Sequence, residues 1–231
     1  APDAILTEFN ELLGEQSGQS IDLLRRDVLV AGTGVTYTNG TTRVGLTATM
    51  DVATLRKVRR TLVTNNARTL TAVLSPSQNI GTAAIAASFF AITHPEVSHD
   101  VRQLTGFVGV ENYGTRQPMH EAEYGSIPSV GFRFLETTQA TLYAGAGGTA
   151  GTTLQGTNSQ ADVYATVCFA ANAFGIIPLR GNALTNHMKA RGTGGTSDPL
   201  DQVGTTGWKA RTTTVILNDN FMHRIESAAS A

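Results

Sequence analysis

The chain has 231 residues, which is enough for one ordinary domain or two small ones with a buried core. Charged residues are scarce, at 15% against about 25% in typical globular domains, whereas 24 residues are glycine. The net charge of −1 provides no global basic field that would attract nucleic acid, and the single cysteine, Cys168, excludes a disulfide framework. The longest apolar run, residues 83–92, is too short to cross a membrane. So few charges predict a neutral surface that other molecules cover.

Residues 3–31 form the first predicted element, a long helix. Asp3 is a favourable N-cap, apolar residues recur every three or four positions, and a Gly-Thr-Gly turn at 32–34 ends the pattern. Gly14 and Gly18 lie on one face, where they either admit the close approach of another backbone or weaken the helix locally. We expect a continuous helix, suited to a scaffold strut, whose sheet-facing side carries Leu6, Phe9, Leu13 and Leu24.

Two shorter helices are expected in the middle of the chain. Asp51 is placed to cap a helix with basic residues on its outer faces and an apolar face made of Val52, Leu55, Val58 and Leu62. Residues 89–92 are apolar and predict a buried strand. Pro95 then stands at the first helical position, which proline favours, so a short helix is expected to begin after His94.

Strands and loops make up the rest of the pattern. Residues 125–135 and 164–177 are expected to form strands, the second one internal because it is nearly all apolar, and residues 208–225 alternate in a strand-like way. Gly- and Thr-rich segments at 145–158 and 192–207 show no periodicity and are expected to be exposed loops. Helices and strands in this order predict an α+β fold.

Histidine and carboxylate side chains gather at two places, which are the best candidates for a metal site. His94 and His99 are five positions apart, and a helix would turn them about 140° away from each other, whereas paired zinc ligands on a helix are four apart. No His-Glu-x-x-His motif occurs. Solvated helix-end side chains are therefore favoured over a metal site made from His94, Glu96, His99, Asp100, His120, Glu121 and Glu123.

Motifs for nucleotide binding and nucleophilic catalysis are incomplete. Residues 145–150 fit the pattern G-x-G-x-x-A, but residues 151–156 would not open the helix that this motif requires, and residues 192–197 lack the lysine of a P-loop. No G-x-S-x-G motif occurs, and Cys168 lies in an apolar strand, where a thiol is normally inert. The sequence therefore predicts no enzyme activity and no cofactor.

The types of the basic residues indicate what kind of contact they make. Fourteen of the seventeen are arginine, which forms planar bidentate pairs and is enriched at protein interfaces, whereas lysine is depleted there. The cluster at residues 56–60 could contact phosphate. Because no aromatic residues are interleaved with it, the solvated face of an amphipathic helix or a contact between subunits is favoured.

Four stretches together resemble one family, the major capsid proteins of tailed bacteriophages like the podophage N-four. The first is IDLLRRDVLVAGT at residues 21–33, and the second is AITHPEVSHDVR at residues 91–102. The third is YGSIPSVGFRFLET at residues 124–137. The fourth consists of DPLDQ, GWK, LND and RIE, which lie between residues 198 and 226. The four stretches follow the family's order and are spread over the whole chain.

This resemblance implies the Hong Kong 97-like coat fold. A peripheral domain would comprise residues 1–44 and 178–231, with a spine helix at 3–31 and a peripheral loop at 189–208, and an axial domain would comprise residues 45–177. The resemblance also implies contacts between subunits, for which the candidate residues are Arg25, Arg26, Arg56, Arg59, Arg60, Lys189, Arg191, Asp198, Asp201, Trp208 and Lys209.

As a coat protein, the chain would form hexamers and pentamers that self-assemble, in the cytoplasm of a host bacterium, into an icosahedral capsid shell. In the virion this shell would enclose the double-stranded DNA genome and contact it nonspecifically. Portal, scaffold and cement proteins would be further partners, and no membrane would be involved. The shell of an encapsulin-type bacterial compartment is one alternative, and a metal-dependent hydrolase that uses His94, His99 and His120 is a more distant one.

The sequence departs from this family at its start and in one loop. Members carry an N-terminal arm and an extended loop before the spine helix, and neither is present in these residues. We therefore expect the natural protein to have a further upstream segment that clasps neighbouring subunits. Residues 145–158 resemble a lineage-specific insertion, to which we assign no role.

Overall fold

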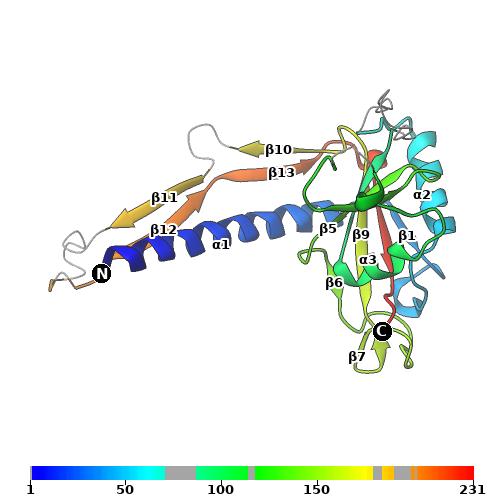
Figure 1. The fold of residues 1–231 in the computed structure, drawn as a ribbon, viewed down its shortest axis with the longest axis horizontal. Coiled ribbons are helices and arrows are strands. Elements are labelled where there is room, and N and C mark those ends of the chain that lie inside the picture. Colours follow the sequence, from blue (N-terminus) through cyan, green and yellow to red (C-terminus); the bar gives the residue numbers. More distant parts are fainter. Residues whose placement is uncertain (1, 71–86, 114–117, 179–183, 190–198, 201) are drawn as a thin grey trace. The chain divides into compact units, whose positions relative to one another are not determined.

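The protein divides into two compact units (Figure 1). The smaller unit consists of Ala1–Arg25 and Gly175–Val215, and the larger unit consists of Arg26–Phe174 and Ile216–Ala231. The family resemblance assigns some residues of the larger unit to a peripheral domain, and that assignment stays a prediction. The computed structural model describes residues 2–70, 87–113, 118–178, 184–189, 199–200 and 202–231.

The described elements are both helices and strands. The helices are α1 (Pro2–Val30), α2 (Val52–Thr64) and α3 (Pro95–Arg102), with short 3-10 helices at Arg43–Gly45, Val110–Asn112 and Asp219–Phe221. None of these helices combines the length and the hydropathy needed to span a membrane. The strands are β1 (Val35–Tyr37), β2 (Phe89–Thr93), β3 (Val108–Gly109), β4 (Glu123–Ile127), β5 (Phe132–Glu136), β6 (Leu142–Tyr143), β7 (Gly156–Thr157), β8 (Gln160–Ala161), β9 (Val163–Phe169), β10 (Phe174–Pro178), β11 (Leu184–Lys189), β12 (Thr205–Ala210), β13 (Thr212–Ile216) and β14 (Met222–Ser227).

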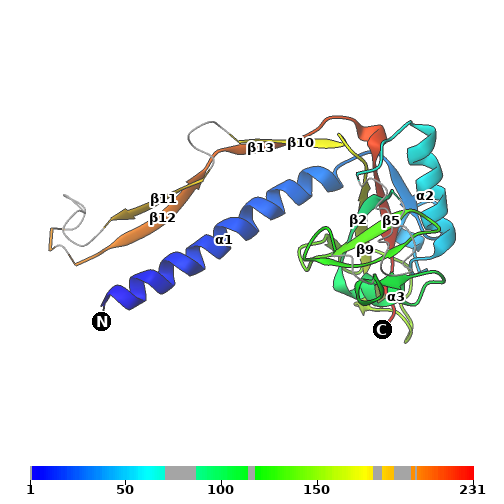
Figure 2. The same cartoon turned by 45° about the horizontal axis from the view of Figure 1, so that its top comes forward.

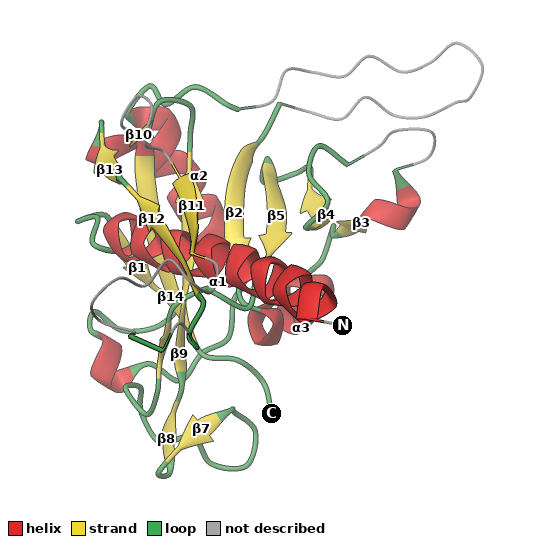
Figure 3. Ribbon diagram, turned by 90° about the vertical axis from the view of Figure 1, so that its left-hand side faces the viewer, coloured by secondary structure: helices red, strands yellow, loops and turns green. Residues whose placement is uncertain are grey.

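A mixed sheet forms the centre of the larger unit. Its strand order is β1-β14-β9-β2-β5-β4-β3, and β6 pairs with β9 beside this path. β1 runs parallel to β14 and β2 runs parallel to β5, whereas the other neighbouring strands are antiparallel. Figure 3 shows β2, β5, β4 and β3 side by side in this sheet. Because parallel strands need a crossover connection, the chain leaves β2 through α3 before it returns as β5.

The helices α2 and α3 complete the main core of the larger unit, and both begin as predicted. The side chain of Asp51 accepts a hydrogen bond from the Thr54 backbone N–H at 2.8 Å, and α3 begins at Pro95 with His94 as its N-cap. The apolar faces of the two helices pack with the sheet in one cluster, which includes Leu55, Val58, Leu62, Val97, Val101, Phe89, Phe132 and Phe134.

The segment at 145–158 is packed more closely than the expected exposed loop. Gly147 and Ala150 are buried, and residues 156–157 form β7. A Cβ at Gly147 would lie 2.6 Å from the Leu46 carbonyl oxygen, so this glycine permits close contact between backbones. Glycine content therefore indicates tight packing at this position, and the prediction of an exposed loop is wrong in part. The cluster beneath it consists of Leu46, Ala150, Ala161, Val163 and Ala228.

The smaller unit contains most of α1 and two pairs of strands. β10 pairs with β13, and β11 and β12 form an antiparallel ribbon. In the described residues four hydrogen bonds join α1 to this ribbon, two to β11 and two to β12, and the elements are also seen in Figure 2. Thr206 Oγ1 donates to Asn10 Oδ1 at 3.2 Å, and Trp208 Nε1 donates to Gln16 Oε1 at 3.3 Å. Polar side chains therefore hold this part of the helix to its neighbouring strand.

Helix α1 confirms the predicted long helix but not its buried face. It runs from Pro2 to Val30 without a break at either glycine. Phe9 and Leu24 were expected to face a sheet, but their side chains are 55% and 65% exposed, and Leu13 is half-buried. The side chain of Leu6 lies outside the described residues. Apolar spacing predicts which side of a helix is apolar, but it does not say whether the same chain covers that side.

Each of two long strands predicted from the sequence is divided into two shorter strands in the structure. β4 and β5 replace the strand expected at 125–135, because Gly131, with a φ of +71°, lies in a turn that reverses the chain. β9 and β10 replace the strand expected at 164–177, where Asn172 has a φ of +61°. β9 is buried as expected, whereas β10 is largely exposed. Turn residues inside an apolar run therefore determined where each strand ends, although the run itself predicted one continuous strand.

The segment at 208–225, which was expected to be one alternating strand-like segment, contains parts of several elements. Residues 208–225 contribute to β12, β13 and β14. Of the loop expected at 192–207, residues 205–207 already belong to β12, while 192–198 and 201 lie outside the described residues.

Candidate functional site

The apolar side chains of the smaller unit are largely uncovered. The three hydrophobic clusters of the described residues all belong to the larger unit. Sixteen large apolar side chains are exposed in the described part of the chain, and ten of them belong to the smaller unit. Such a number of exposed apolar side chains in one unit favours contacts with other molecules. We call the following ten residues the apolar surface: Phe9, Leu12, Leu24, Ile176, Ile177, Leu184, Met188, Leu200, Val203 and Val215.

Three of the predicted interface residues lie on the ribbon of β11 and β12. Lys189 pairs with Thr205 at one end of the ribbon, and Lys209 pairs with Thr185 near the other end, so the structure does not bring these lysines together. Both lysines are exposed, and Trp208 is half-buried by its contact with α1. The ribbon therefore presents two separated positive charges beside apolar side chains. The predicted interface residues Arg191, Asp198 and Asp201 lie outside the described residues.

Arg25 and Arg26 stand next to each other in α1 but differ in their surroundings. Arg26 belongs to the larger unit, where it forms an ion pair with Asp27 at 2.7 Å and donates to the Gln139 carbonyl at 2.9 Å. Arg25 belongs to the smaller unit and is half-buried, and its Nε has no hydrogen-bond partner. Arg26 thus already has partners within the chain, whereas Arg25 retains an unused donor.

The predicted basic cluster lies on α2. Arg56, Arg59 and Arg60 are exposed, as the amphipathic pattern predicts, and the opposite side of the helix is buried. These arginines belong to the larger unit, so they lie on a different unit from the apolar surface.

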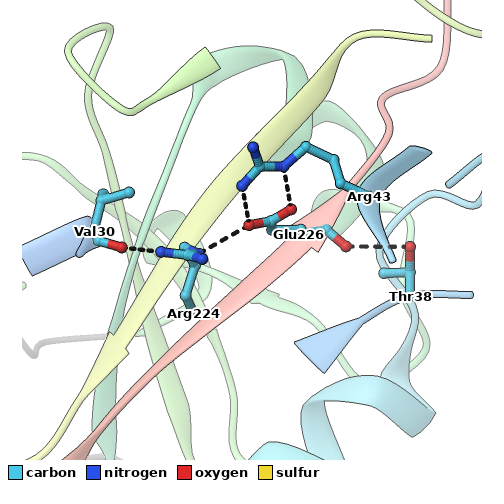
Figure 4. A network of polar contacts seen from close by, with 5 residues as sticks. All are labelled: Val30, Thr38, Arg43, Arg224 and Glu226. Carbon is cyan, nitrogen blue, oxygen red and sulfur yellow. Dashed lines mark hydrogen bonds and ion pairs between the residues drawn. The ribbon is translucent and has the colours of Figure 1, made fainter. Parts of the chain in front are cut away.

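A network around Glu226 fixes the last residue of α1 to β14 (Figure 4). The Glu226 carboxylate is fully buried and accepts hydrogen bonds from Arg43 Nε at 2.6 Å and Arg43 Nη2 at 2.7 Å. Arg224 Nε forms an ion pair with the same carboxylate at 2.9 Å, and Arg224 Nη1 donates to the Val30 carbonyl. The Glu226 carbonyl accepts from the Thr38 N–H at 3.1 Å. The network therefore satisfies a carbonyl at the C-terminal end of α1, which the helix itself leaves unpaired.

A stacking contact completes this network. The Arg43 guanidinium lies 3.5 Å from the centre of the Tyr143 ring, and its hydrogen bonds to Glu226 raise the pKa of the guanidinium above its ordinary value. Sequence reasoning missed the network. The available signal was that Arg224 and Glu226 are two apart on a strand and so share one face, but nothing in the sequence indicated their partner Arg43.

The residues weighed as metal ligands contribute to packing and capping. His94 Nδ1 accepts from the Glu96 N–H, and its ring centre lies 4.8 Å from that of Tyr164, so burial lowers the pKa of this histidine. Asp100 accepts from the Ser230 N–H at 3.0 Å and thereby ties down the C-terminal end of the chain. His99 contacts Gln103. In the described ranges, no three His, Cys, Asp or Glu side chains are grouped so as to hold a metal ion.

Glu123 belongs to a buried polar group. Its carboxylate accepts from the Tyr113 hydroxyl at 2.9 Å and the Met119 N–H at 3.0 Å, and Arg133 Nη1 lies 3.5 Å away. Burial raises the pKa of Tyr113, which therefore stays protonated as a donor. The carboxylate is thus engaged inside the fold. A shallow pocket beside it is lined by Arg102, Glu121 and Glu136, among others.

Comparisons with known proteins give matches among solved structures. No family model and no curated protein matches this sequence. A chain in the capsid of Ralstonia phage GP4 matches 98% of this chain with a TM-score of 0.65 at 11% identity, over 68% of its own length. A chain in the capsid of the cyanophage P-SCSP1u matches 97% with a TM-score of 0.54 at 13% identity, over 66% of its own length. A chain in the head structure of Helicobacter pylori bacteriophage KHP40 matches 97% with a TM-score of 0.54 at 10% identity, over 68% of its own length.

This chain therefore spans about two thirds of the length of the capsid chains that it matches. At these identities the likeness shows the fold. The α+β class predicted from the sequence is confirmed, and the chain has the fold of phage capsid chains.

Proposed function

We propose that this chain is the structural subunit of a phage capsid, which self-assembles through hexamers and pentamers into an icosahedral shell around a double-stranded DNA genome. The observation that carries the proposal is the likeness of the whole chain, at 97–98% coverage, to chains of three phage capsids. The four sequence stretches that resemble major capsid proteins of tailed phages support it independently.

The apolar surface supplies the physical reason for assembly. A subunit that leaves these side chains in water loses the hydrophobic free energy of burying them, which is about 25 cal/mol per Å² of apolar area. Other copies of the chain cover this surface in the shell. Polar residues rim the contact, as is usual at interfaces. The rim residues that we propose are Arg25, Lys189, Arg191, Asp198, Asp201, Trp208 and Lys209.

The proposal includes the setting of the protein and its other partners. The shell forms in the cytoplasm of the host bacterium and becomes part of the virion, and portal, scaffold and cement proteins bind to it. The subunit has no catalytic turnover. Support for this last point comes from the polar groups of the larger unit, where Glu123 and Asp100 are engaged in contacts that stabilise the fold.

The experiment is assembly of the purified protein in its natural full length, followed by sedimentation velocity and negative-stain electron microscopy. We expect closed shells or ring-shaped capsomers whose fraction rises with protein concentration. A protein that stays monomeric at all concentrations would contradict the proposal.

A matched pair of variants identifies the surface that drives assembly. Leu24→Gln removes an apolar side chain that is 65% exposed in the smaller unit, and Val44→Gln removes one that is 77% exposed in the larger unit. Neither change is expected to alter the unfolding temperature by much, because exposed substitutions usually shift stability by less than about 0.5 kcal/mol. We expect Leu24→Gln to lower the assembled fraction and Val44→Gln to leave it unchanged.

A further inference from the structure

Helix α2 and the segment after it carry a continuous basic stretch. One side of the helix is buried in the core of the larger unit, and the other side carries four basic residues together with alanine, threonine and Val63. Arg68 follows in an exposed position within the same unit. We call this set the basic face, and it comprises Arg56, Lys57, Arg59, Arg60 and Arg68.

The basic face has few acidic neighbours: Asp51 caps the start of α2, and Asp219 acts, like Lys57, on the pKa of His223. Residues 52–95 contain neither Asp nor Glu, although the chain as a whole has a net charge of −1. Ion pairs occur elsewhere in the described residues, and none involves a member of the basic face. Five of the seventeen basic residues thus lie between positions 56 and 68, and none of them forms an ion pair in the described part of the chain.

We propose that the basic face binds the phosphate backbone of double-stranded DNA and lies toward the interior of the shell. The choice of DNA as the anion rests on the proposed function, because such a shell encloses that polymer. A duplex carries one negative charge per about 1.7 Å of its axis. The four cations of α2 extend over about 6 Å of helix, so some phosphates lie within their reach wherever the protein sits along the duplex.

The residue types favour phosphate over bases. Arginine offers planar paired donors that match two phosphate oxygens. Residues 51–70 contain no Phe, Tyr or Trp that could stack on a base. Contacts to phosphate position a protein but carry no sequence information. The basic face is therefore expected to bind duplexes of different sequence equally.

A protein partner fits this surface less well. Protein interfaces contain an apolar core, whereas α2 and the described residues after it expose only Val63 and Leu70 as large apolar side chains. The exposed apolar side chains of the described chain are concentrated in the smaller unit instead. Subunit contacts and DNA contacts are thus assigned to different units.

The test measures binding of the chain to a fluorescently labelled duplex of mixed sequence by anisotropy, at several salt concentrations. Each phosphate that the protein neutralises contributes about one to the slope of log affinity against log salt. We expect Arg60→Gln to lower this slope by about 1 and the double variant Arg56→Gln/Arg60→Gln by about 2. Arg56→Lys/Arg60→Lys retains both charges and should retain the slope.

Matched controls separate a local effect from a change in total charge. Arg211→Gln removes one exposed positive charge outside the basic face and should leave the slope unchanged. Equal slopes for Arg60→Gln and Arg211→Gln would overturn the proposal. Displacement of the duplex by a polyglutamate peptide as readily as by unlabelled DNA would also overturn it, in favour of an acidic protein partner.

Electron microscopy of the same proteins distinguishes this proposal from the proposed function. We expect Arg56→Gln/Arg60→Gln to form shells like the unaltered chain while its salt slope falls. Loss of shells in this folded variant would show that these arginines are subunit contacts and would overturn the DNA assignment. Failure of the natural full-length protein to assemble would contradict the proposed function, and the salt slope would still report on DNA binding.

Discussion

The two units of the protein differ in how far their apolar side chains are buried. In the larger unit, α2, α3 and a mixed sheet bury theirs in hydrophobic clusters, and Phe132 is completely inaccessible. In the smaller unit, α1 meets the ribbon of β11 and β12 through polar contacts such as that between Asn10 and Thr206, and the apolar surface faces outward. The larger unit therefore has a hydrophobic core of its own, whereas we propose that other copies of the chain cover the apolar side chains of the smaller unit.

The largest expected difference between the units is in the loss of stability when a phenylalanine is replaced by alanine. Phe132→Ala should lower the free energy of unfolding by about 3–5 kcal/mol, because the change leaves a cavity in the main core. Phe9→Ala, at a side chain that is 55% exposed, should change it by less than about 0.5 kcal/mol. Urea denaturation of the unassembled chain measures both. A comparable loss in the two variants would show that the smaller unit has a core of its own.

The buried network should show the next largest effect. Glu226→Gln removes the buried charge that Arg43 and Arg224 share and should cost about 3 kcal/mol, since it leaves two partly buried cations without a counter-charge. Asp27→Asn breaks the more exposed pair with Arg26 and should cost less than about 1 kcal/mol. Thermal unfolding of both variants checks this order, and a reversed order would mean that the network does not anchor the end of α1.

A single cap tests the stability of α2 within the larger unit. Asp51→Ala deletes the acceptor of the Thr54 N–H and should lower the free energy of unfolding by about 1 kcal/mol. Asp51→Asn retains a capping oxygen and should restore most of this loss. Should the two variants be equally destabilised, the carboxylate would be acting through its charge and not through the hydrogen bond.

The smallest effect is a dependence of stability on pH. Burial, and then the neighbouring Lys57, lower the pKa of His223, whose Nε2 lies 2.6 Å from Thr36 Oγ1. The unfolded chain therefore binds a proton at a higher pH than the folded chain, so stability falls as the pH drops below about 6.5. His94 has a lowered pKa for the same main reason. We expect the unfolding temperature of His223→Gln to decline less between neutral and mildly acidic pH than that of the unaltered chain.

Local signals in the sequence predicted the helices but not their surroundings. Asp51 and Pro95 fixed the starts of α2 and α3, because capping and proline geometry depend on neighbouring residues alone. The exposure of Leu24 was not predictable, because its spacing is the same whether the chain itself or another copy covers it.

Ion pairs between residues that are distant in the sequence could not be predicted either. Arg43 and Glu226 are 183 positions apart, and no periodicity relates them. The candidate interface residues, among them Trp208 and Lys209, were chosen by family resemblance and residue type, and their role stays a prediction. Neither signal could reveal that the exposed apolar side chains are concentrated in one unit.

Hydrogen–deuterium exchange of free subunits and assembled shells, read by mass spectrometry, tests the central claim most directly. The account predicts that assembly protects the segments around the apolar surface, above all 184–189 and 205–210, more strongly than the core strands β2, β5 and β9. These strands should already be protected in the free subunit, because they are buried there. Shells in which the segments of the smaller unit exchange as fast as in free subunits would contradict the account.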